Sequence, residues 1–288
     1  MENLHKENKV IRIGRAPGVP ETQPYAAFIC YADWTDKHLH LMHQHEDMAE
    51  ILIFVQGKGQ YMLGGVWYPV QAGDIALCSY GMVHDEIPQM GEKYCTYCLG
   101  ISGLHLPGLP QGALIPPGQV PVFHQPPQFG ELYALASMIE HHAAMHIAGY
   151  QSFCHHLTCA ILALIPQMAA QSLPAAQDTL CVRVKRYIDQ HYAEELTLER
   201  LGQEFYISPY HLAHIFKQQT GYTVKQYILR RRIGQAQSRL VDTSDSISKI
   251  AADMGFTDAA YFTRLFTRHI GMPPGGYRIL RKGKGQDS

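Results

Sequence analysis

Residues 201–216 read LGQEFYISPYHLAHIF, and residues 250–266 read IAADMGFTDAAYFTRLF. Apolar residues recur at helical spacing in both stretches and are interrupted once by turn residues, a pattern that predicts helix, tight turn and helix. Such a unit can insert its second helix into the major groove of DNA, and two units in tandem can read successive grooves. Three pairs of matching residues lie fifty positions apart: Phe216 and Phe266, Gly221 and Gly271, Tyr227 and Tyr277.

Start and stop signals frame the second helix of each unit. Ser208 before a proline is typical of a helix start, and Thr257 is expected to cap the matching helix. Gly221 and Gly271 are expected to end the two helices. Residues 224–240 between the units predict one connecting helix about 27 Å long. That length can hold the two recognition helices roughly one DNA turn apart, about 34 Å.

The apolar residues of each second helix fall on one stripe that must face inward. The opposite face is then free to reach bases and phosphates. One polar face is usually only solvated, but two copies at one spacing favour DNA contact. Arg230, Arg231 and Arg232 on the connector are open to two readings, phosphate contact or pairing with acidic neighbours. The predicted DNA-binding residues are Tyr210, His211, His214, Lys217, Asp258, Ala259, Thr263, Arg264, Thr267 and Arg268.

The net charge of −1 conceals a division between the two halves of the chain. Residues 1–177 carry 7 Lys+Arg and 14 Asp+Glu, a net of −7, whereas residues 178–288 carry 17 and 11, a net of +6. A basic half beside an acidic half favours contact between the basic half and a polyanion. A nonspecific nucleoid protein is disfavoured, because the basic excess is modest.

Residues 180–281 resemble the DNA-binding domain of AraC/XylS-type bacterial transcription regulators. Residues 250–266 carry the family's most specific pattern, Ile-Ala-x-x-x-Gly-Phe-x-x-x-x-Tyr-Phe-x-Arg-x-Phe, and residues 271–278 continue it with Gly-x-x-Pro-x-x-Tyr-Arg. Thr257 stands where the family often has a serine cap. The resemblance implies binding to double-stranded promoter DNA, contact with RNA polymerase, homodimerisation and activation of transcription, often of genes for carbohydrate use.

The N-terminal half has a different pattern. Between residues 11 and 108, short apolar runs alternate with Gly, Pro and Asp, which predicts an all-β sandwich or barrel. Residues 129–148 and 150–170 then predict two helices with apolar stripes. They resemble the helical segment through which sensor domains of this family dimerise, and packing on the barrel alone is the other reading. The first stripe is Leu132, Leu135, Met138 and Ile139, and the second is Leu157, Ile161, Leu164 and Ile165.

A histidine-rich constellation lies within the predicted strands. It resembles the two motifs of the cupin β-barrel over roughly residues 25–105, and in metal-binding cupins these motif positions hold one ion. The matching residues here are His43, His45, Glu50 and His84. This set of ligand types suits Zn, Fe(II), Mn or Ni. Three readings stay open: a metal site, a polar pocket for a small molecule with or without metal, and exposed histidines without a role. Trp34 and Tyr61 are further predicted ligand-binding residues, able to stack on a sugar.

These observations predict an α+β protein with an N-terminal cupin-like β-barrel and dimerisation helices, followed by an all-α double helix-turn-helix domain. The expected boundaries are 11–172 for the sensor and dimerisation domain, 173–177 for the linker and 178–281 for the DNA-binding domain. No run of eighteen apolar residues occurs, so no membrane span is expected. The polar N-terminus and seven cysteines without framework spacing favour the cytoplasm.

The predicted function is that of a ligand-responsive regulator, not an enzyme, that senses a small molecule, such as a sugar, in the barrel. No cofactor is required, although a divalent metal would suit the barrel. The rival from another class is a metal-dependent cupin enzyme fused to a DNA-binding module.

Overall fold

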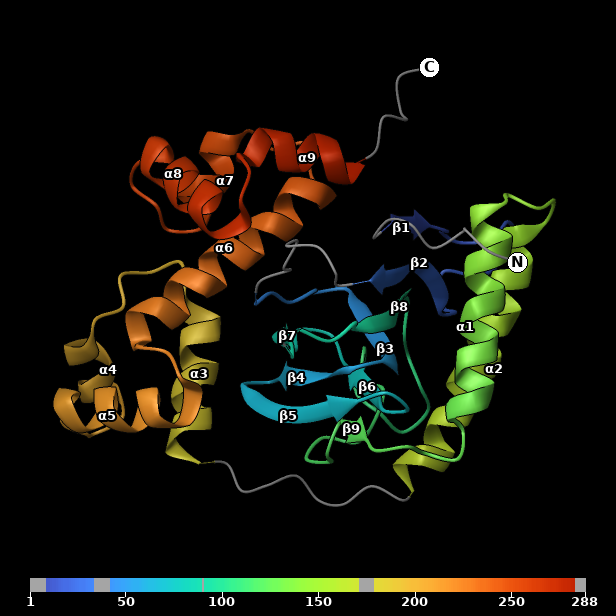
Figure 1. Cartoon of the computed structure of the whole chain (residues 1–288), viewed down its shortest axis with the longest axis horizontal. Coiled ribbons are helices and arrows are strands. Elements are labelled where there is room, and N and C mark those ends of the chain that lie inside the picture. Colours follow the sequence, from blue (N-terminus) through green and yellow to red (C-terminus); the bar gives the residue numbers. More distant parts are fainter. Residues whose placement is uncertain (1–8, 34–41, 90, 171–178, 283–288) are drawn as a thin grey trace.

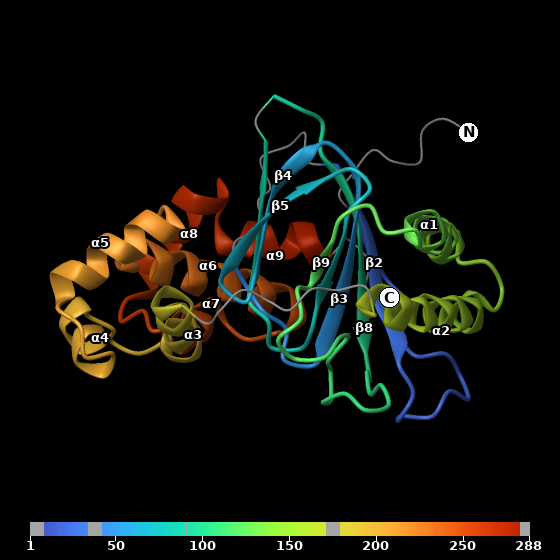
Figure 2. The ribbon, with the colours of Figure 1, turned by 90° about the horizontal axis from the view of Figure 1, so that it is seen from below.

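The computed structural model describes residues 9–33, 42–89, 91–170 and 179–282. A β domain lies at the centre, the helices of residues 129–169 cover one side of it, and the helices of residues 180–282 lie on the other (Figures 1 and 2). The α+β class is confirmed. The predicted linker at 173–177 and Trp34 fall outside the described residues, so the division between the domains stays a prediction.

Nine strands form the described part of the β domain. They make a six-stranded sheet with the order β1-β2-β8-β3-β6-β9 and a three-stranded sheet with the order β5-β4-β7. The first strand begins two residues before the predicted domain start, because Lys9 and Val10 pair with the next strand. The strands are β1 (Lys9–Arg12), β2 (Tyr25–Asp33), β3 (Met48–Gln56), β4 (Lys58–Leu63), β5 (Val66–Gln71), β6 (Ile75–Cys78), β7 (His84–Pro88), β8 (Cys95–Ser102) and β9 (Val122–Phe123).

Strand β3 shows how the sequence builds two apolar layers. Successive side chains of a strand point to opposite faces. Ile51 and Ile53 pack in the cluster shared with the covering helices, while Leu52 and Phe54 pack in the cluster that joins the two sheets. Both faces are therefore buried, and a continuous apolar run results in place of an alternating pattern. Glu50 shares the inner face with Leu52, as its position two residues earlier requires.

Helices α1 (Phe129–Ala144) and α2 (Tyr150–Ala169) pack on the outer face of the six-stranded sheet (Figure 2). Most residues of the predicted stripes pack against this core, whereas Met138 is 43% exposed. Helix α2 is long and apolar enough to cross a membrane by length and composition alone. Its buried Ile161 and Ile165 pack in the core beneath it, as expected for the core helix of a globular domain.

The remaining helices form two similar units joined by α6. Ser208 caps α5, and Gly221 and Gly271 end α5 and α8 in the left-handed conformation, as the sequence predicts. Ser246 caps α7. The predicted Thr257 cap is wrong, because Asp258 Oδ1 accepts the hydrogen bond from Ala260 N at 2.8 Å. The helices are α3 (Leu180–His191), α4 (Leu198–Glu204), α5 (Pro209–Thr220), α6 (Val224–Asp242), α7 (Ile247–Asp253), α8 (Ala259–Ile270) and α9 (Pro274–Lys282).

The turn between α7 and α8 depends on a glycine. Gly255 has φ +76°, and an added Cβ would lie 2.1 Å from the carbonyl oxygen of Ala193. We therefore expect Gly255→Ala to lower the free energy of unfolding by about 2–3 kcal/mol, since strain at positive φ and a backbone clash add together. Chemical denaturation would measure this loss. Gly271→Ala is the matched control, because φ is +86° there but nothing lies within 4 Å. An equal loss in both variants would contradict the clash.

Candidate functional site

A cavity of about 440 Å³ lies between the β domain and α6. Its size is within the usual range for small-molecule sites, about 300–1,000 Å³. Strands of the β domain form most of its wall, and Ser238, Val241 and Asp242 of α6 contribute the rest. The predicted ligand residues His43, His45, Glu50, His84 and Tyr61 all line this one cavity.

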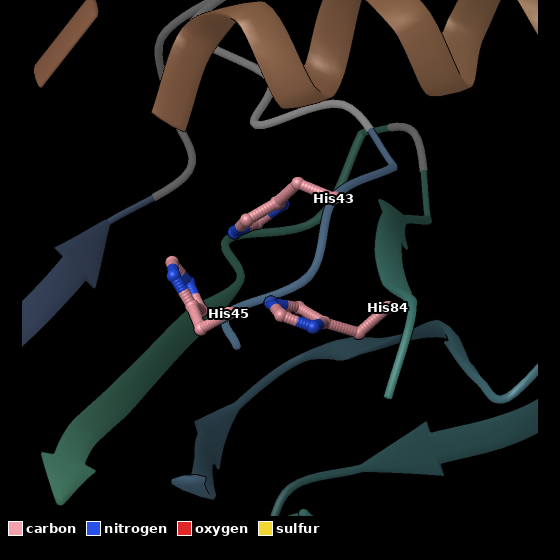
Figure 3. Close-up of side chains that lie close together, drawn as sticks. All are labelled: His43, His45 and His84. Atoms are coloured by element: carbon pink, nitrogen blue, oxygen red, sulfur yellow. The ribbon is translucent and has the colours of Figure 1, made fainter. Parts of the chain in front are cut away.

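Three histidines converge in the cavity from two segments of the chain (Figure 3). His43 and His84 are held together by a pair of backbone hydrogen bonds, 3.0 and 2.9 Å long. His45 follows two residues after His43, which explains why the two side chains share one side. One ring nitrogen from each of the three histidines lies within 4.8 Å of the others.

Glu50 bridges two of the imidazoles. Its Oε1 lies 3.2 Å from His45 Nε2, and its Oε2 lies 3.1 Å from His84 Nε2. Burial alone would raise the pKa of Glu50, but the charges and hydrogen bonds of His84 and His45 outweigh it and hold this pKa well below its ordinary value. Burial would lower the pKa of His84, but Cys78 and Glu50 outweigh it and raise this pKa well above its ordinary value. The arrangement therefore favours an ionised Glu50 paired with an imidazolium.

The same side chains fit a divalent metal ion in their chemistry. Ligands that share one ion, each about 2.0–2.2 Å from it, lie roughly 3–4 Å apart. The two distances from Glu50 to the histidines, 3.2 and 3.1 Å, fall in that range. Small side-chain movements would draw the three ring nitrogens together. His43, His45, His84 and Glu50 are therefore the residues that would hold an ion.

The aromatic predictions have mixed outcomes. Tyr61 lines the cavity and is 1% exposed, and its hydroxyl has no hydrogen-bond partner among the described residues. Trp67, for which the sequence leaves stacking on a ligand and a place in the core equally open, packs with the apolar cluster that includes α3 and α6. Trp34 lies outside the described residues.

Sequence reasoning missed the part of the cavity wall that α6 supplies. Ser238, Val241 and Asp242 lie about 150 residues from the cupin-like motifs, and no sequence pattern connects the two regions.

Sequence reasoning also missed Glu86. This residue is buried and lines the cavity, and one of its carboxylate oxygens has no partner among the described residues. The signal for Glu86 was its position two residues after His84 on one strand, which places both on the same face.

The two recognition helices, α5 and α8, present the predicted DNA-binding residues on their outer faces. Leu212, Phe216, Phe262 and Phe266 are fully buried beneath them. The predicted residues Ala259, Thr263 and Thr267 are half-buried, and both threonine hydroxyls donate hydrogen bonds to carbonyls of their own helix. The exposed members of the predicted set are Tyr210, His211, His214, Lys217, Asp258, Arg264 and Arg268.

The three arginines of α6 all have protein partners. Arg230 pairs with Asp85 at 2.9 Å. Arg231 is 0% exposed and lies 3.3 Å from Asp189. Arg232 donates hydrogen bonds to three backbone carbonyl oxygens. Arg230 and Arg231 therefore pair with acidic neighbours in this arrangement, which is one of the two interpretations that the sequence left open.

The fold and these two sites define a protein with a ligand-binding β domain and a helix-turn-helix DNA-binding domain. Comparison with known families agrees: residues 25–173 match the AraC-like ligand binding domain, and residues 201–279 match a helix-turn-helix domain. The chain belongs to the AraC family of helix-turn-helix transcription regulators.

Relatives that match most of the chain are named as transcription regulators. The transcriptional activator RhaR of Shigella dysenteriae serotype 1 is 26% identical over 89% of this chain and 93% of its own. The uncharacterised regulator YdiP of Escherichia coli K12 is 23% identical over 85% of this chain and 82% of its own. Among solved structures, unsaturated fatty acid bound ToxT from Vibrio cholerae is 12% identical, with a TM-score of 0.45, over 98% of this chain and 100% of that chain.

Proposed function

We propose that this regulator binds a small-molecule effector in the cavity between the β domain and α6, and that α5 and α8 bind successive major grooves of promoter DNA. The observation that carries the proposal is the position of the cavity, which five predicted ligand residues and the helix joining both recognition helices line together. A ligand shifts such a protein only if it binds one arrangement more tightly than another. The naming of RhaR as an activator supports activation over repression.

Selection of genomic fragments by the purified protein tests the DNA-binding part. We expect one or a few specific sites, each with two half-sites about one helical turn apart, because the two units share one connecting helix. Affinity for these sites should exceed affinity for random DNA at least 1,000-fold at physiological salt. Equal recovery of random fragments would contradict the proposal.

A divalent metal ion is a second candidate occupant of the cavity. It is favoured by the three ring nitrogens that lie within 4.8 Å of one another. When bound, such an ion would act as a Lewis acid and as a fixed positive charge. The rival function, a metal-dependent cupin enzyme fused to a DNA-binding module, uses the same side chains. We prefer the regulator because the relatives RhaR and YdiP are transcription regulators.

Cobalt(II) is the probe for this second candidate. We expect one equivalent to bind and to give a visible absorption spectrum that is lost in His43→Ala, since neutral imidazoles are good ligands for such ions. His124→Ala is the matched control: its imidazole pairs with Asp74 outside the cavity lining. Binding that is unchanged in His43→Ala would remove the histidine cluster as the metal site.

The surface of α1 and the turn after it supports a homodimer. Four large apolar residues there are exposed: Tyr133, Met138, Met145 and Ile147. A second copy of the chain is the proposed partner, and sedimentation should give twice the mass of 32.4 kDa. Met138→Lys should then yield a monomer, since a charge would be buried without a partner.

Contact with RNA polymerase at the promoter and a cytoplasmic location complete the proposal.

A further inference from the structure

The two domains meet over a continuous apolar surface. Met42, Met62 and Val83 of the β domain pack in one cluster with Val184 of α3 and Tyr227 of α6. All five of these residues are 3% exposed or less. The cluster joins Tyr227 of α6 with Met42 and Val83, which directly precede His43 and His84.

Polar contacts join α6 to the same two segments. Arg230 Nη2 donates to Asp85 Oδ2 at 2.9 Å, and Arg231 Nη2 donates to Gln44 Oε1 at 2.6 Å. Asp85 directly follows His84, and Gln44 lies between His43 and His45. The three histidines and Asp85 line the cavity, and Asp85 and Gln44, the residues beside the histidines, also bind α6. In Figure 3 the helix that crosses above the imidazoles has the colour of α6.

We propose that the effector site is shared by both domains: α6 forms one wall of the cavity, and the bonds from Arg230 to Asp85 and from Arg231 to Gln44 keep this wall closed. This inference deepens the proposed function and rests on it. A molecule in the cavity contacts the histidines on one side and Ser238 and Val241 on the other, so it binds best when the domains are docked. By linkage, an effector that prefers the docked arrangement must also hold α6 against the β domain.

The pair of Asp85 and Arg230 makes the contact between the two domains sensitive to the loss of either charge. The Asp85 side chain is 0% exposed and that of Arg230 is 18% exposed. When one partner of such a pair is removed, the other charge stays buried without compensation. Removal of both charges together avoids this penalty. The single variant Arg230→Gln should therefore open the contact between the domains more than the double variant Asp85→Asn/Arg230→Gln does. A simple loss of packing would not produce this difference.

Alkylation of Cys98 by N-ethylmaleimide measures the closure without DNA and without an effector. Cys98 lines the cavity, whereas Cys159 is exposed on α2 and serves as the reference within the same molecule. We expect Arg230→Gln to raise the alkylation rate of Cys98 relative to Cys159 at least tenfold, because the domains open more often. The double variant Asp85→Asn/Arg230→Gln should show a clearly smaller increase.

Two further variants complete the test. Ser238→Trp should slow the alkylation of Cys98 at least threefold, since the larger side chain would fill the cavity from α6. Arg239→Gln is the matched control on the same helix: Arg239 pairs with Asp245 and Asp253 within the DNA-binding domain, so no change is expected. An unchanged Cys98 rate in Arg230→Gln or Ser238→Trp would overturn the inference, as would an equal increase at Cys159. Such a result would leave the DNA selection above untouched, so the two proposals can fail separately.

Discussion

Replacement of Arg264 by alanine should lower the affinity for the selected DNA site by about 5- to 150-fold, equivalent to about 1–3 kcal/mol. Arg264 is exposed on the outer face of α8, and it forms no ion pair with any residue that the structure describes. Its guanidinium lies 5.9 Å from the centre of the Tyr261 ring, which keeps it on the surface of the helix. A bidentate contact with a guanine would account for a loss of this size. Fluorescence anisotropy with the selected site measures it.

Lys58→Ala is the matched control for this experiment. It removes the same charge from an exposed position on β4, in the β domain. Both variants lose one positive charge, whereas a base contact can be lost only in Arg264→Ala. An affinity that Arg264→Ala leaves unchanged would exclude α8 from the contact with bases.

Replacement of both His45 and His84 by alanine should abolish the response to the effector and leave DNA binding intact. The effector would first be found by a thermal-shift screen of sugars and small acids, because a ligand at 100 times its Kd stabilises the folded protein by about 2.7 kcal/mol. In the double variant this stabilisation should fall below detection. Retained stabilisation would place the effector elsewhere.

The structure adds a necessary companion variant. Without His45 and His84, Glu50 would be a buried carboxylate without either of its partners. The double variant can lose about 3–5 kcal/mol of folding stability for this reason alone. His45→Ala/His84→Ala/Glu50→Gln removes the stranded charge, so its melting temperature should rise above that of the double variant while the effector response stays absent. A restored response in the triple variant would contradict the role of the histidines.

Local patterns predicted the secondary structure of the DNA-binding half well, because its helix boundaries depend on short-range chemistry. Ser208 and Gly221 act through their own backbone and hydroxyl groups, so their effect needs no distant contact. The error at Thr257 has the same origin: two adjacent residues could both cap the helix, and the conformation of the turn selects Asp258.

The candidate site was predictable only in part. His43, His45, Glu50 and His84 follow a motif in which the order of strands brings the residues together. The wall from α6 could not be predicted, since periodicity within one segment contains no information on which distant segment packs against it. The partners of Arg230 and Arg231 could not be predicted either, because the sequence does not distinguish an exposed arginine from a buried one.

The sequence by itself determined the two helix-turn-helix units, the β domain and the set of histidines, since caps, glycines and apolar spacing act over a few residues. Only the tertiary structure decided that α6 closes the cavity and that its arginines bind the residues beside the histidines. Docking of two domains depends on the shape and charge of whole surfaces, and those surfaces exist only after each domain has folded.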